Sequence, residues 1–190
     1  MKILKSPLAV KIITTLILII SVIVFFYFEP SVILRILIIF LGLIGVWQLS
    51  KTPEILILLS LYIILNDFYN IRYGLAIPLA VIMVAVFVVT AYLFYAYSKI
   101  GQFVIDEAKI FNIFLLVIGL ISLEIFLVMS FWPVEPKTKS LVIAICFYVA
   151  TRIFYLHINN VLNLKKAAGY ILVSLFVLAG VIALSWRLGF

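Results

Sequence analysis

GLAIPLAVIMVAVFVVTAYLFYAYS, residues 74–98, is an apolar run without a single charged residue. A helix that crosses the hydrocarbon core of a bilayer needs about 20 mostly apolar residues, so this run is long enough to cross. It is rich in valine and alanine and ends in Tyr92, Tyr95 and Tyr97, a pattern typical of the aromatic belt at a membrane surface. The run predicts a transmembrane helix.

Apolar runs of similar length flank it and predict six further spans, over residues 8–28, 31–50, 53–71, 110–131, 139–157 and 168–186. Seven spans use roughly 140 residues, which leaves only short tails and loops in a chain of 190. The expected fold class is an all-α integral membrane protein, a bundle of seven transmembrane helices. We expect a single transmembrane domain over residues 1–190 and no soluble domain.

The composition excludes a soluble or disordered chain. Hydrophobic residues make up 68% of the sequence, charged residues make up 11%, and the mean hydropathy is +1.41. A soluble domain of this length buries only about 70% of its surface, so such a chain would expose large apolar patches to water. Disorder requires low hydrophobicity, which is the opposite of what this sequence has.

The third span, 53–71, is the weakest of the seven. It begins with Thr52, Pro53 and Glu54, which favour a helix start by capping, by ring geometry and by charge. Its apolar stretch, 55–65, is short and leads into the polar turn NDFYN at 66–70. We expect the span to cross with that turn at the membrane interface. A bundle of six spans is the alternative.

The first run is expected to be a retained helix. Lys2, Lys5 and Lys11 precede the apolar residues 12–28, as in a signal peptide. The run is longer than a typical signal-peptide core, however, and no A-x-A cleavage site follows it.

Lysine and arginine on alternate sides of the spans predict the orientation, because positively charged loops stay in the cytoplasm. The N-terminal side carries nine of them: Lys2, Lys5, Lys11, Lys51, Lys99, Lys109, Arg152, Lys165 and Lys166. The opposite, outer side carries five: Arg35, Arg72, Lys137, Lys139 and Arg187. We expect a cytoplasmic N-terminus and an outside C-terminus. The net charge of +7 then reflects orientation and anionic lipid, not nucleic acid.

Familiar catalytic and metal-binding patterns are missing from the sequence. Cys146 is the only cysteine and His157 the only histidine, so a disulfide, a CxxC site or a His/Cys metal cluster cannot form within the chain. No GxSxG, HExxH, P-loop or GxGxxG motif occurs. We expect no catalytic residue, no metal and no cofactor, and the interpretation leans away from an enzyme.

Three charged residues are expected at membrane depth, where an unpaired charge is costly and faces a partner or water. Glu124 lies about 10 Å from the outer end of span 110–131, among apolar neighbours. Arg35 and Arg152 are its candidate partners. We expect a buried ion pair of Glu124 with one of these arginines. Alternatively, Glu124 faces a water-filled cavity as a proton or cation site.

Further polar side chains gather on the outer side. They could bind a lipid headgroup or an anionic substrate, although an ordinary solvated interface with aromatic anchors has the same composition. The expected members are Glu29, Asn66, Asp67, Asn70, Arg72, Trp132, Glu135 and Arg187, with Lys137 and Lys139 beside them.

The expected function is that of a non-catalytic accessory or scaffold subunit that contacts another membrane protein, a second copy of itself or the lipid bilayer. One alternative is a small carrier or channel that uses a buried Glu124, and the other is a protein that handles lipid headgroups at the outer polar face. The excess of lysine over arginine and the frequent isoleucine are typical of AT-rich prokaryotic genomes. We therefore expect the plasma (inner) membrane of a prokaryote.

A reporter of membrane sidedness fused after Phe190 is expected to report the outside of the cell, because seven spans place the two termini on opposite sides. The measurement is the activity of a reporter that works on only one side of the membrane. A cytoplasmic reading would contradict seven spans and favour six.

Overall fold

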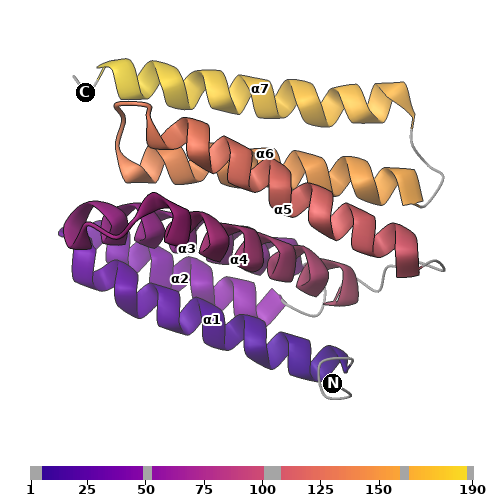
Figure 1. Ribbon diagram of the computed structural model, residues 1–190, viewed down its shortest axis with the longest axis horizontal. Helices are drawn as coiled ribbons and strands as arrows, with labels where there is room; N and C mark the ends of the chain where they lie inside the picture. Colours follow the sequence, from indigo (N-terminus) through magenta and orange to yellow (C-terminus); the bar gives the residue numbers. More distant parts are fainter. Residues whose placement is uncertain (1–5, 49–52, 101–107, 159–162, 188–190) are drawn as a thin grey trace.

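The computed structural model describes residues 6–48, 53–100, 108–158 and 163–187, and these ranges form seven α-helices without a strand. The helices are α1 (Pro7–Phe28), α2 (Val32–Gln48), α3 (Pro53–Leu75), α4 (Leu79–Ile100), α5 (Ala108–Ser130), α6 (Pro136–Ile158) and α7 (Leu164–Arg187). They lie side by side and alternate in direction, so α1 and α7 run the same way (Figure 1). The predicted all-α fold class is confirmed.

Five of the helices, α1, α3, α4, α5 and α6, are long and apolar enough to cross a membrane. α2 and α7 carry shorter apolar stretches, Val32–Trp47 and Ala167–Val181. The 17 residues of α2 extend about 26 Å, slightly less than the roughly 30 Å of a bilayer core. The structure therefore supports a helical membrane protein with five candidate spans, and the count of seven stays a prediction.

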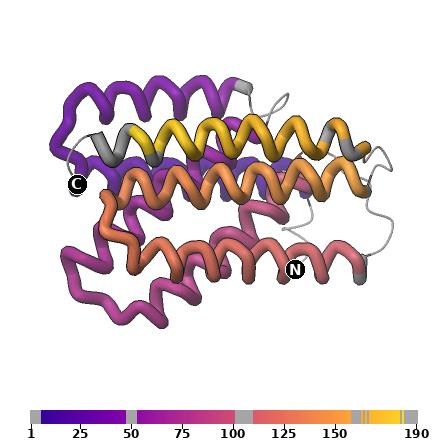
Figure 2. The backbone as a smooth tube through the Cα atoms, turned by 90° about the horizontal axis from the view of Figure 1, so that it is seen from above, coloured from indigo at the N-terminus to yellow at the C-terminus, as the bar shows by residue number. Residues whose placement is uncertain are grey.

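α3 is the central helix and packs against α1, α2, α4 and α6. α2 packs against α3 and α1, and α7 packs chiefly against α6, so both lie at the periphery of the bundle (Figures 1 and 2). We call the end of the bundle where α1, α3, α5 and α7 begin the near end. The end where α2, α4 and α6 begin is the far end.

The weak hydropathy of α3 follows from its central position. In the most apolar stretch of α3, 56% of the residues are buried inside the bundle. This is the largest share among the five candidate spans. Asn66 and Asp67 in the polar turn are 1% and 4% exposed. Neighbouring helices therefore cover these two side chains, and the expected position of the turn at the depth of a membrane interface stays a prediction.

The connection between α3 and α4 is a tight turn over residues 76–78. Ala76, which follows the last residue of α3, has a φ of 52°, in the left-handed region that favours glycine. The N–H of Val81 donates to the carbonyl of Pro78 at 3.1 Å, so Pro78 caps α4 from outside the helix. The helix expected from residue 74 thus begins five residues later, at Leu79, directly after Pro78.

Replacing Ala76 with glycine is expected to stabilise the bundle by about 1 kcal/mol, because a residue with a Cβ is strained at positive φ. The measurement is thermal unfolding of the purified protein in detergent. Ala85→Gly, within α4, is the matched control and should destabilise by about 1 kcal/mol. A loss of stability in Ala76→Gly similar to that in Ala85→Gly would contradict the strained turn.

Candidate functional site

Glu124 is exposed on the outward face of α5 and not buried between helices. Exposed apolar side chains surround it on that face, among them Leu120, Ile121 and Val128. It forms no ion pair with any residue that the structure describes. The expected buried pair of Glu124 with Arg35 or Arg152 is wrong, since both arginines have other partners. Glu124 also cannot line a cavity in the interior of the bundle.

Arg152 pairs instead with Glu54 near the near end, where it joins α6 to the start of α3. The hydroxyl of Tyr97 on α4 donates to the same carboxylate at 3.4 Å. The guanidinium of Arg152 lies over the rings of Tyr148 and Tyr170, 5.5 and 6.0 Å from their centroids. One ion pair therefore connects α3, α4, α6 and α7.

The sequence did not reveal Glu54 as the partner of Arg152. A glutamate at the start of a helix is already explained by its favourable interaction with the helix dipole. Arg152 lies six residues before the end of α6, about 9 Å into the bundle, and its long side chain reaches back to the near end. The tyrosine expected in a surface belt, Tyr97, is only 3% exposed, because it packs inside the bundle toward this pair.

Glu54→Gln is expected to destabilise the protein by about 1–3 kcal/mol, because it leaves the half-buried Arg152 without its charged partner. Arg152→Gln should cost a similar amount. The double variant should cost less than the sum of the two, by about 1 kcal/mol or more. Thermal or denaturant unfolding in detergent measures all three. Strict additivity would show that the pair contributes nothing to folding.

Glu29 organises the far end. Its side chain is 3% exposed and pairs with Nζ of Lys137 at 2.9 Å, linking the α1–α2 connection to the start of α6. It also accepts from the N–H of Ser31 at 3.0 Å. Nε of Arg35 donates to the backbone carbonyl of Glu29 at 2.7 Å. Both Arg35 and Glu29 are thus satisfied locally.

A small polar pocket of about 170 Å³ lies at the far end. We call it the far-end pocket. Four of the residues expected on the outer polar face line it: Glu29, Asn66, Asn70 and Glu135, together with Lys137. They come from the α1–α2 connection, from α3 and from the start of α6, so the structure brings together groups that are far apart in the sequence.

The other members of the expected outer cluster are not in the lining of this pocket. Asp67 is buried in the bundle, Arg72 lies over the ring of Tyr73 at 5.4 Å, and Trp132 is half-exposed between α5 and α6. The side chain of Arg187 lies outside the described residues. The far-end pocket therefore joins Glu135 to neither Asp67 nor Arg72.

Lys139 has a role that its sequence position did not suggest. It was expected among solvated cations, but it is only 3% exposed. Its Nζ lies 5.4 and 5.3 Å from the ring centroids of Tyr69 and Tyr73 and 3.0 Å from the hydroxyl of Tyr73. Aromatic faces attract cations electrostatically, so these two rings stabilise the buried ammonium.

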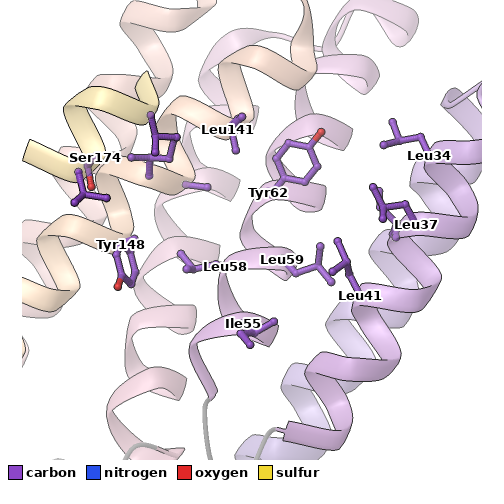
Figure 3. A pocket seen from close by; sticks show the side chains of 15 residues that line it. Leu34, Leu37, Leu41, Ile55, Leu58, Leu59, Tyr62, Leu141, Tyr148 and Ser174 are labelled. Atoms are coloured by element: carbon purple, nitrogen blue, oxygen red, sulfur yellow. The ribbon is translucent and has the colours of Figure 1, made fainter. Parts of the chain in front are cut away.

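An apolar groove runs along the side of the bundle between the peripheral helices α2 and α7 (Figure 3). We call it the lateral groove. Its volume is about 600 Å³. Leu37 of α2 lies on one wall, Leu58 and Tyr62 of α3 lie on the floor, and Ser174 of α7 lies on the opposite wall (Figure 3). The lining is almost entirely hydrocarbon.

No group of three or more His, Cys, Asp or Glu that could hold a metal ion occurs among the described residues. No protein-family model matches the chain, and neither a curated protein nor a solved structure matches it. What the protein does must therefore be inferred from its own surfaces.

Proposed function

We propose that the chain is a non-catalytic accessory or scaffold subunit of a prokaryotic plasma membrane, with seven spans, a cytoplasmic N-terminus and an outside C-terminus. It acts through contacts between its helices and other membrane components. The observation that carries this proposal is the exposure of Glu124 on an otherwise apolar face of α5.

A charged side chain in the hydrocarbon core costs about 3 kcal/mol on insertion scales. Glu124 lies six residues before the end of α5, about 9 Å from the far end, among exposed leucine, isoleucine and valine. Because no described residue of its own bundle pairs with it, a hydrogen-bond donor or cation on the helix of a neighbouring protein would offset this cost. The face around Glu124 is the expected contact surface.

The carrier or channel alternative loses its basis, because it requires Glu124 to face a cavity within the bundle. Three charged side chains within the bundle have partners: Arg152 pairs with Glu54, Lys139 contacts the hydroxyl of Tyr73, and Glu29 pairs with Lys137. These contacts connect neighbouring helices. A carrier would need a charged group that changes partners, whereas an accessory subunit does not.

Glu124→Leu is expected to abolish recovery of a stoichiometric membrane partner with the tagged full-length chain, because it removes the polar anchor of the contact. The same variant should leave the free energy of unfolding unchanged within about 0.5 kcal/mol, since Glu124 contacts no described polar partner. The measurements are mass spectrometry of the copurified proteins and thermal unfolding in detergent.

Glu135→Gln is the matched control, because Glu135 is a second exposed carboxyl at the far end of the bundle. It should retain the partner. Recovery of the wild-type chain alone, or an unchanged partner in Glu124→Leu, would reject the proposal that the α5 face is the contact surface.

A further inference from the structure

The lateral groove and the far-end pocket are neighbours. On each of three chain segments, a residue that lines the groove lies four residues from one that lines the pocket, which is about 6 Å where both residues belong to one helix, as in α3 and α6. The pairs, groove residue first, are Tyr62 and Asn66, Leu141 and Lys137, and Leu34 and Pro30. An apolar site along the side of the bundle therefore ends at a polar site at the end of the bundle.

The lateral groove suits a hydrocarbon chain. Leucine, isoleucine and valine from four helices line it, and it opens sideways between α2 and α7 (Figure 3). In a membrane, this opening faces the acyl chains of the bilayer. An acyl chain in the groove keeps all of its surface in contact with apolar atoms.

The far-end pocket needs a hydrogen-bond donor. The carboxylate of Glu29 is already satisfied by Lys137 and by the N–H of Ser31. Asn66 is 1% exposed, and its Oδ1 has no hydrogen-bond partner among the described residues. A buried acceptor without a donor is costly, so a ligand with an N–H in this pocket would relieve that cost.

The charges of the far-end pocket favour the same kind of ligand, one with N–H donors. It contains two carboxylates and one ammonium, and Lys137 is paired with Glu29, so the exposed carboxylate of Glu135 remains. A primary ammonium has three N–H donors and no acceptor, which matches the carboxylate of Glu135 and the amide oxygen of Asn66. A quaternary ammonium has no N–H, and a purely anionic headgroup would meet two carboxylates.

We propose that the lateral groove and the far-end pocket together bind a phospholipid whose headgroup carries a primary amine. The acyl chain lies in the groove, the ammonium lies between Asn66 and Glu135, and the phosphate lies within reach of Lys137. This lipid site is separate from the α5 face that contains Glu124. It does not depend on the scaffold function.

The test measures which lipids stay bound to the full-length chain. The protein is reconstituted into vesicles of phosphatidylethanolamine, phosphatidylcholine and phosphatidylglycerol in equal amounts with identical acyl chains, and is then extracted in mild detergent. Mass spectrometry of the bound lipid is expected to show phosphatidylethanolamine enriched about tenfold over phosphatidylcholine, as a net gain of about one hydrogen bond implies.

Variants separate the two parts of the site. Glu135→Gln and Asn66→Leu should remove the preference for phosphatidylethanolamine, whereas Asn66→Asp keeps an acceptor and should retain it. Leu37→Trp should reduce the total bound lipid, because Leu37 lines the groove. Leu43→Trp is the matched control on the same helix, since Leu43 is exposed and not in the lining.

Equal binding of phosphatidylethanolamine and phosphatidylcholine by the folded wild-type chain would overturn the proposal. A preference for phosphatidylglycerol would also overturn it, because the pocket would then recognise an anion through Lys137. An unchanged preference in both Glu135→Gln and Asn66→Leu would place the amine elsewhere and reject the assigned pocket.

Discussion

The structure depends on the enclosure of α3 by four other helices. A helix that faces lipid on all sides must be apolar, whereas a helix that is surrounded by protein can hold polar groups that its neighbours satisfy. α3 uses this freedom at both of its ends. Glu54 at the near end meets Arg152, and Tyr69 at the far end donates from its hydroxyl to the carbonyl of Phe126 at 3.1 Å. The polar groups of α3 thereby fix how α4, α5 and α6 pack.

The far end shows how neighbouring side chains satisfy charges in the interior of the bundle. Tyr69 stacks on Phe126 with ring centroids 4.4 Å apart, and the ring of Tyr73 lies nearly parallel to that of Tyr69. Lys139 rests against both tyrosines, so a single column of rings from α3 and α5 holds a cation from α6. At the same end of the bundle, Glu29 and Lys137 form a direct ion pair. The two lysines of the α6 start therefore stabilise the bundle in different ways.

The sequence was sufficient for the helical class and for helix positions, since apolar runs and flanking charges mark both. Pairing could not be predicted, because it depends on how helices rotate against one another. Glu124 seemed suited to a buried pair by its depth, yet its face of α5 points outward. Arg152 pairs with a carboxylate, but with Glu54 and not with Glu124, and an ordinary capping pattern had hidden Glu54 as a partner. The far-end pocket could be predicted in part from the sequence. Four of its polar residues were expected together, whereas Asp67 and Arg72, expected with them, do not line it.

In the membrane-spanning arrangement proposed above, the central position of α3 has a consequence for how the chain enters the membrane during synthesis. A segment with polar residues at its core partitions poorly from the translocation channel into lipid on its own. α1 and α2 emerge before α3 and are strongly apolar. They can therefore enter the bilayer first, and α3 can then pack against them. α6, the other helix that packs closely on α3, emerges much later. Until α6 follows, the side of α3 that packs against α6 has no protein neighbour, so the partly made chain exposes that side.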